Sequence, residues 1–295
     1  MKKNLGLAFG ITAYCLWGLF PLYWPLLKEA GAFEIVAHRA IWTMVFCTIV
    51  IIFRKETGLI FSLLKNKRTM LLLALATVLI SINWLTYIWA TNHQHVVESA
   101  LGYYINPLIM IAFGTLFLKE KLRTLQWAAV GMGLVGVIIM TVDLGHPPYI
   151  ALTLALSWGS YGFVKKQLGL GSLESLAIET LIAFIPYFIY IMVITHQGNG
   201  HFGHGFKITA LLIGAGVITA VPLLLFNGAA TRLTMTMTGL LQFITPTLQF
   251  IIGVAVRHEA VSTGRWIGFF AIWVALFALG TDLIQSNRKM AINQN

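Results

Sequence analysis

The residues of this chain that could do chemistry are polar and aromatic side chains inside long apolar runs. Such groups are costly in lipid, so they should face a protein interior or a cavity. Amides, hydroxyls and rings of this kind suit the binding of an amphipathic organic solute. Packing between helices with local hydrogen bonds is the alternative for each of them. The candidates for a solute cavity are Asn83, Trp84, Tyr87, Tyr103, Tyr104, Asn106, Trp158, Tyr161, Asn227, Gln242, Phe243 and Thr245.

Two of these polar residues each precede a proline. Asn106 stands before Pro107, and Thr245 stands before Pro246. Proline inside a helix removes one hydrogen bond and leaves a carbonyl one turn back without its donor. Helix breaks are therefore predicted at both prolines, where the polar neighbour either satisfies the backbone or lines the solute site.

Charged candidates lie near the expected outer surface. His38 and Arg39 begin an apolar run one turn inside that surface, and Glu98 begins another on the same side. They are candidates for the outer mouth of a pathway or for its gate, with Arg39 contacting an anion and His38 changing charge near neutral pH. The alternative is an Arg39 that extends to the interface or pairs with Glu98.

Motifs for catalysis or nucleotide binding are missing from the sequence. It has no phosphate loop and no His-Glu-x-x-His or Gly-x-Ser-x-Gly motif. No catalytic residue, cofactor or metal is therefore predicted, and Cys15 and Cys47 are interpreted as small buried hydrophobic residues. Transport energy would come from a solute or ion gradient, and neither the coupling ion nor the oligomeric state follows from the sequence.

The elements that must position these residues are membrane-spanning helices. Of the 295 residues, 58% are apolar and only 10% are charged, against about 25% charged in an ordinary soluble domain. About 20 residues cross a bilayer, so ten spans fit, all helical because a helix satisfies its own backbone. The predicted spans are 5–24, 35–53, 70–90, 98–118, 125–142, 149–164, 176–195, 209–230, 236–256 and 266–284.

The basic residues give these spans a direction. With the N-terminus in the cytoplasm, 15 of the 20 Lys and Arg residues fall on the inner side and five on the outer side. This bias follows the positive-inside rule and requires an even number of spans with both termini cytoplasmic. The net charge of +10 is therefore attributed to membrane orientation, and nucleic acid is excluded as a partner.

The two halves of the chain resemble each other at a shift of 139 residues. Five residues of the first half, Pro107, Gly114, Glu120, Trp127 and Asp143, match Pro246, Gly253, Glu259, Trp266 and Asp282 in the second. Five spans in each half make the second repeat enter the membrane from the opposite side, as in secondary transporters. The predicted domains are residues 1–145 and 146–285, each a five-helix repeat, followed by a cytoplasmic tail at 286–295.

Several longer motifs resemble a known family. They are the runs 38–42 (HRAIW), 83–90 (NWLTYIWA), 98–107 (ESALGYYINP), 157–162 (SWGSYG) and 240–247 (LLQFITPT). Together they resemble the RarD proteins, in the EamA branch of the drug/metabolite transporter superfamily, over essentially the whole chain. The resemblance implies an all-α inner-membrane permease of ten helices in two inverted repeats. Related small multidrug pumps use a glutamate in the first span, and this chain has none there.

The sequence therefore predicts a secondary transporter that moves a small metabolite or an amphipathic, drug-like solute across the inner membrane by alternating access. Its expected partners are this solute and the lipid bilayer. Two other classes stay open: a membrane-embedded enzyme that handles a lipid, and an assembly subunit that transports nothing.

Overall fold

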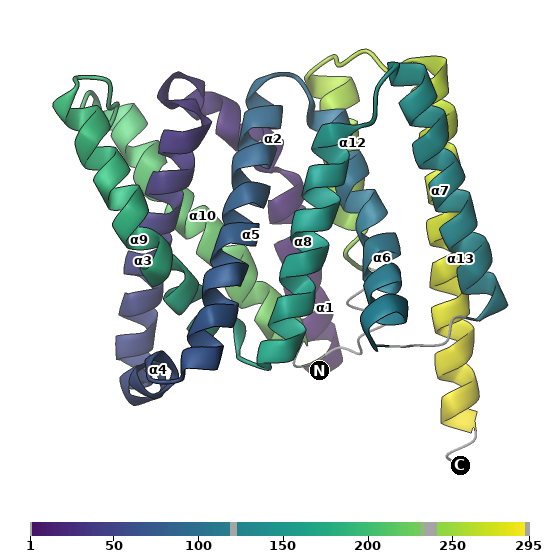
Figure 1. Ribbon diagram of the computed structural model, residues 1–295, viewed down its shortest axis with the longest axis horizontal. Coiled ribbons are helices and arrows are strands. Elements are labelled where there is room, and N and C mark those ends of the chain that lie inside the picture. Colours follow the sequence, from purple (N-terminus) through teal and green to yellow (C-terminus); the bar gives the residue numbers. More distant parts are fainter. Residues whose placement is uncertain (1, 119–122, 231, 233–240, 293–295) are drawn as a thin grey trace.

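The protein is helical throughout the part of the chain that the computed structural model describes, residues 2–118, 123–230, 232 and 241–292, which contains no strand (Figure 1). Its elements are α1 (Lys2–Gly18), α2 (Phe20–Tyr23), the 3₁₀ helix η1 (Trp24–Ala30), α3 (Gly31–Arg54), α4 (Thr57–Leu64), α5 (Lys67–Asn92), α6 (Val96–Leu118), α7 (Thr124–Leu144), α8 (Tyr149–Leu168), α9 (Ser172–His196), α10 (Phe206–Ala230), α12 (Ile244–Ile251), the π-helix η2 (Ile252–Val256) and α13 (Thr263–Ile292).

Each of the ten predicted spans coincides with a helix or helix pair of the described chain, namely α1, α3, α5, α6, α7, α8, α9, α10, α12 with η2, and α13. Residues 236–240 of the predicted ninth span lie outside the described residues. The first span ends earlier than expected, at Gly18, and the chain continues through α2 and η1. Helix α4, in a stretch with no predicted span, has no buried residue.

Apolar side chains cover the outside of the bundle. Phe53 is 83% exposed, Val142 76% and Phe277 75%. On length and composition alone, Asn4–Arg54, Lys67–Asn92, Thr124–Leu144, Leu173–His196 and Phe206–Phe226 can cross a bilayer, and Ile244–Val256 and Thr263–Ala278 are shorter apolar helices. Contiguous apolar surface of this extent fits lipid rather than water. The chain is a multi-pass membrane protein.

Both repeats contribute to one interleaved bundle. Helix α1 packs against α10, and its counterpart in the second repeat, α8, packs against α5. Likewise α6 packs against α8, and its counterpart α12 packs against α1. Helices α7 and α13, the last of each repeat, form a pair at one edge (Figure 1). This exchange of partners is what two inverted repeats produce.

Small residues allow the α7–α13 pair to approach closely. A Cβ atom placed on Gly136 would lie 2.8 Å from the Gly268 carbonyl oxygen, and one on Gly268 would lie 3.0 Å from the Gly136 oxygen. Gly131, on the same helix, has nothing within 4 Å of such an atom. Backbone contact between these helices therefore depends on Gly136 and Gly268.

The two ends of the bundle are distinct. Helix α1 begins and α13 ends at the same end (Figure 1), which we call the termini side. The turns between α5 and α6, α7 and α8, α9 and α10, and η2 and α13 lie at the opposite end, which we call the loop side.

Pro107 and Pro246 lie at different positions within their helices. Helix α6 continues through position 107, so the break predicted at Pro107 is not found. A proline removes only one hydrogen bond of the helix, and the remaining bonds keep a long helix continuous. Pro246 lies in the first turn of α12, directly after a turn at Gln242 and Phe243.

Candidate functional site

Asn83 on α5 connects three helices in the interior. Its Nδ2 donates to the Leu154 carbonyl oxygen at 3.1 Å and to Ser157 Oγ at 3.0 Å, both on α8. Its Oδ1 accepts from the Tyr103 hydroxyl of α6 at 3.3 Å. Asn83 and Ser157 are buried. One amide thus positions α5 and α6 of the first repeat against α8 of the second.

Aromatic rings extend from this amide. The Tyr87 and Tyr103 ring centroids are 5.7 Å apart, those of Tyr103 and Trp158 6.4 Å, and those of Trp158 and Tyr161 5.7 Å. Tyr103 shares an edge-to-face contact with each of its two neighbours, an arrangement that the ring quadrupoles favour. We call Asn83, Tyr87, Tyr103, Ser157 and Trp158 the central polar group.

The members of the central polar group lie at similar depths. Asn83 stands nine residues before the loop-side end of α5, Tyr103 seven residues into α6, and Ser157 eight residues into α8. At 1.5 Å per residue, these are about 10 to 14 Å from the helix ends. The group is therefore close to the middle of a hydrocarbon layer about 30 Å thick.

Arg39 on α3 is buried beside this group, in an aromatic box formed by Phe20, Trp24 and Trp84. Its guanidinium carbon lies 3.9 Å from the Trp84 ring centroid, 5.1 Å from that of Trp24 and 5.7 Å from that of Phe20. Its Nε donates to Thr219 Oγ1 on α10 at 2.7 Å. Tyr87 and Tyr103 are electrostatic neighbours of the Arg39 guanidinium, so the box and the central polar group adjoin.

The alternatives predicted for Arg39 are not found. Helix α3 begins at Gly31, four residues earlier than expected, so Arg39 lies about 12 Å along the helix rather than one turn inside the surface. It does not extend to the interface, since only 4% of the residue is exposed. It does not pair with Glu98, whose described partners are His95, at 3.7 Å, and the Ile150 amide.

His38 belongs to a different contact from its neighbour Arg39. Its ring stacks on Phe202 with centroids 4.9 Å apart, and its Nε2 lies 3.9 Å from Glu34 Oε1. Glu34 in turn accepts a hydrogen bond from the His201 amide at 2.8 Å. His38 therefore packs beneath the turn between α9 and α10.

Other cavity candidates form a second group around α12. Tyr104 Oη and Thr247 Oγ1 are 2.8 Å apart, and the Tyr104 ring contacts Phe269 and Trp273 of α13. Phe243 packs against the same apolar cluster. The structure thus separates Tyr104 and Phe243 from the central polar group.

Three more candidates for the solute cavity are Thr245, Gln242 and Asn227. Thr245 Oγ1 donates to the Tyr14 carbonyl oxygen of α1 at 2.8 Å, so its hydroxyl satisfies backbone. Gln242 is half-buried in the turn before α12. The side chain of Asn227 lies outside the described residues.

Several buried polar atoms have no hydrogen-bond partner among the described residues, and four of them lie on helices that surround the central polar group. These four are Nη1 of Arg39, the Tyr87 hydroxyl, Oδ1 of Asn106 and Oε1 of Gln249. Asn106 and Gln249 are 1% and 2% exposed, and the Gln249 side chain neighbours the Tyr87 hydroxyl. Buried polar groups are nearly always hydrogen-bonded. These atoms are therefore available to a bound molecule.

The sequence did not single out Gln249, Thr219, Ser157 or Trp24. Gln249 could have been chosen as a candidate, because it is an amide in the middle of a predicted span. Nothing in the sequence distinguishes Thr219 and Ser157, since hydroxyl side chains are common in membrane spans and form hydrogen bonds with carbonyl oxygens of their own helix. Trp24 was assigned to the end of the first span, yet it follows the end of α1 and is fully buried beside Arg39.

A buried acid lies deeper than expected on the termini side. The predicted span 176–195 puts Glu179 in its first turn, but α9 begins at Ser172, so Glu179 is about 10 Å along the helix. Its Oε1 lies 2.8 Å from Lys165 Nζ, and its Oε2 accepts from the Tyr161 hydroxyl at 3.0 Å. Tyr161 thus connects this ion pair to the ring of Trp158.

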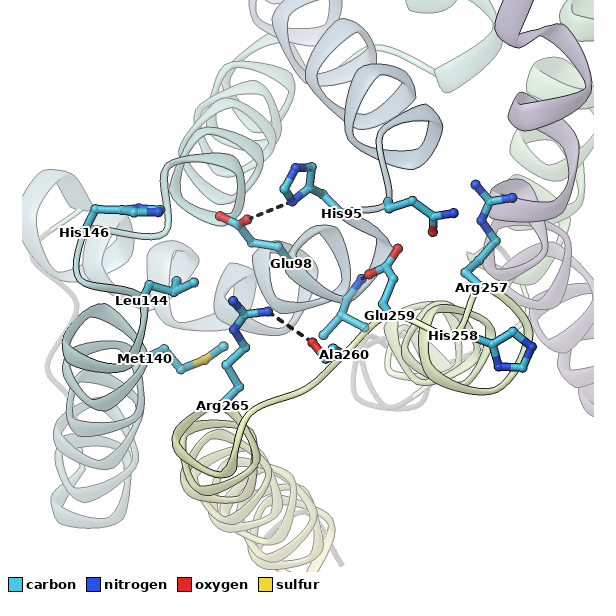
Figure 2. A pocket seen from close by; sticks show the side chains of 12 residues that line it. His95, Glu98, Met140, Leu144, His146, Arg257, His258, Glu259, Ala260 and Arg265 are labelled. Carbon is cyan, nitrogen blue, oxygen red and sulfur yellow. Dashed lines mark hydrogen bonds and ion pairs between the residues drawn. The ribbon is translucent and has the colours of Figure 1, made fainter.

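A pocket of about 460 Å³ opens on the loop side (Figure 2). It contains Glu98 and His95, together with Arg257 and Glu259 from the turn between η2 and α13. The Glu259 carboxylate accepts from the Val96 and Val97 amides at 2.7 and 2.8 Å. A turn of the second repeat therefore caps the N-terminus of α6 in the first.

This geometry defines a class: a polytopic membrane protein of inverted repeats with a polar, aromatic interior near the middle of the membrane. The EamA-like transporter family matches the chain twice, over residues 4–142 and 148–281. The chain belongs to this family and is a membrane transporter.

Curated relatives agree. The chain is 45% identical to protein RarD of Streptomyces exfoliatus, over 98% of this chain and 92% of the relative. It is 44% identical to the uncharacterized transporter YojE of Bacillus subtilis, over 93% of each. It is 36% identical to protein RarD of Escherichia coli, over 98% of each. The chain therefore has the sequence of a RarD-type protein over nearly its whole length.

A solved structure shares the fold. It is described only as "Crystal structure of protein", and it superposes with a TM-score of 0.63 at 17% identity, covering 96% of this chain and 98% of its own. At this identity the likeness concerns the fold alone.

Proposed function

We propose that this protein is a secondary transporter that moves a small, amphipathic organic solute across the cytoplasmic membrane by alternating access. The observation that carries the proposal is the set of buried, unpartnered polar atoms on Arg39, Tyr87, Asn106 and Gln249. A solute with amide, hydroxyl or carboxyl groups supplies the missing partners. The rings of the central polar group receive its apolar part.

Both repeats contribute to this site. Helices α3, α5 and α6 come from residues 1–145, and α8, α10 and α12 come from residues 146–285. In inverted-repeat transporters the solute binds between the repeats near the midplane, and the repeats rock about it. We infer that these two units move against each other around the central polar group.

The charges support one orientation. Arg54, Lys55, Lys65, Lys67 and Arg68 cluster around α4 on the termini side. By the positive-inside rule this side faces the cytoplasm, together with the tail at 286–295. A reporter fused after Gly145 should then report an outside location, and a cytoplasmic signal there would contradict the ten-span arrangement.

The energy source follows from the sequence and the site. Since the sequence contains no nucleotide-binding motif, transport uses a solute or ion gradient. The described buried carboxylates, Glu34 and Glu179, already have protein partners, so amides, hydroxyls, rings and the Arg39 guanidinium hold the solute.

The test is solute flux in proteoliposomes that contain the full chain. Vesicles are loaded with a mixture of small metabolites, and efflux of each is followed by mass spectrometry. Tyr103→Phe removes the hydroxyl that meets Asn83 and should reduce flux of the transported solute at least tenfold. Tyr149→Phe is the matched control, because Tyr149 is exposed on the loop side. Equal flux in the two variants would place the site elsewhere, and no flux of any solute would contradict transport.

A further inference from the structure

Arg39 carries a charge deep in the bundle, and no acidic side chain among the described residues pairs with it. It lies about 12 Å along α3 and is 4% exposed. Charged side chains at such depth are rare in membrane proteins and are almost always paired. Arginine keeps its charge in nearly every protein environment, so the absence of a counter-charge requires an explanation.

The contacts of Arg39 are all neutral. Within the described residues its hydrogen bond goes to the Thr219 hydroxyl, which itself donates to the Ala215 carbonyl oxygen at 2.8 Å. Its Nη1 has no partner within the described residues. The aromatic box of Phe20, Trp24 and Trp84 supplies cation–π attraction. Rings compensate only part of the lost hydration of a buried cation.

Neighbouring acids do not complete the compensation. Glu34 is held by His201, and Glu179 is held by Lys165 at 2.8 Å. Within the described part of the chain no carboxylate oxygen lies within 4.0 Å of the Arg39 guanidinium nitrogens. The site therefore has a surplus positive charge with a free N–H donor.

The surroundings of this charge select a kind of anion. A planar guanidinium matches the two oxygens of a carboxylate, and the Tyr87 hydroxyl and Gln249 amide are polar groups with unpartnered atoms on nearby helices. The rings of the box and of the central polar group suit an apolar or aromatic body attached to that carboxylate. A small, strongly hydrated inorganic anion would not use these rings.

We propose that Arg39 is the counter-ion for the carboxylate of the transported solute, and that the solute is an amphipathic organic carboxylate. This inference rests on the proposed transport function and adds the chemical class of the solute. The cavity beside Trp84, lined also by Ala40 and Tyr187, measures about 10 Å³. It is too small for any organic molecule and Arg39 is not among its lining residues, so the carboxylate reaches the guanidinium only when the repeats move apart.

The test uses full-length protein purified in detergent and its thermal unfolding. A ligand that binds the native state raises the unfolding temperature. The probes are phenylacetate, indole-3-acetate and octanoate, each paired with its own primary amide, and chloride at the same concentration. The proteins are the unaltered chain, Arg39→Gln, Arg39→Lys and the control Arg265→Gln, which removes a partly exposed arginine from the loop side.

At least one carboxylate should raise the unfolding temperature of the unaltered chain, and its amide should not. Arg39→Gln should abolish this rise, Arg39→Lys should keep part of it, and Arg265→Gln should keep all of it. If Arg39→Gln does not fold, the partial response of Arg39→Lys decides. A response to the amides, to chloride alone, to no probe, or equally in the Arg39 variants would overturn the proposal.

Measurements of solute flux distinguish the proposed transport function from the proposed carboxylate class of the solute. If proteoliposomes export a neutral or cationic solute equally with and without the Arg39 side chain, transport stands and the carboxylate class fails. If no solute is exported by any variant, the proposed function itself fails.

Discussion

Replacing Asn83 with leucine tests whether one amide holds the two repeats together. Leucine has similar volume but accepts and donates no hydrogen bond, so the bonds to Tyr103, Leu154 and Ser157 are all lost. Hydrogen bonds between membrane helices contribute about 0.6 kcal/mol each on average. Asn83→Leu should therefore lower the free energy of unfolding by about 2 kcal/mol, roughly 30-fold in the equilibrium constant.

The assay is reversible unfolding of the purified protein in mixed micelles, followed by circular dichroism. Asn92→Leu is the matched control, because Asn92 is buried near the loop-side end of the same helix and its Oδ1 accepts no hydrogen bond from the described residues. Its replacement should cost less than that of Asn83. Solute flux should fall in Asn83→Leu, because the Tyr103 ring loses its anchor. Equal stabilities for the two variants, with unchanged flux, would refute the reasoning.

Three further changes test the packing and the caps. Gly136→Ala places a Cβ 2.8 Å from the Gly268 carbonyl oxygen and should destabilise by about 1 to 3 kcal/mol, whereas Gly131→Ala, with open space, should be neutral or stabilising in the same unfolding assay. Glu179→Gln breaks a buried ion pair and should lower the free energy of unfolding by about 3 kcal/mol. In a double-mutant cycle, adding Lys165→Met should recover part of this loss. Additive effects of the two substitutions would mean that the pair contributes nothing. Glu259→Gln weakens the cap at the start of α6 and should speed amide hydrogen exchange at Val96 and Val97, so unchanged protection in mass spectrometry would show that the cap is dispensable.

The length of the apolar runs was enough to predict the helices, because each span must satisfy its own backbone in lipid. It also predicted that the second repeat enters from the opposite side, since each repeat has an odd number of spans. What it could not predict was where the first span ends. Hydropathy does not distinguish a straight helix to Trp24 from one that ends at Gly18 and continues into η1.

The site was predicted in part. Asn83, Tyr87, Tyr103 and Trp158 were expected near each other, and the structure places them in contact. Arg39 was placed at the outer mouth with His38 and Glu98, because all three begin spans on one side. The structure separates them, since adjacent residues on a helix point about 100° apart and Glu98 belongs to a helix on the other side of the bundle. The spacing of residues along the chain does not show which side chains of distant helices point toward each other.

Alternating access requires the central polar group to open to each side of the membrane in turn, and cysteine labelling from both sides tests this. Cys15 and Cys47 are replaced by alanine, Ser157→Cys is introduced, and a membrane-impermeant maleimide is applied to either side of sealed, oriented vesicles. We predict that this cysteine reacts from both sides and that the transported solute slows both reactions. Reaction from one side only, or from neither while solute still crosses the membrane, would contradict it.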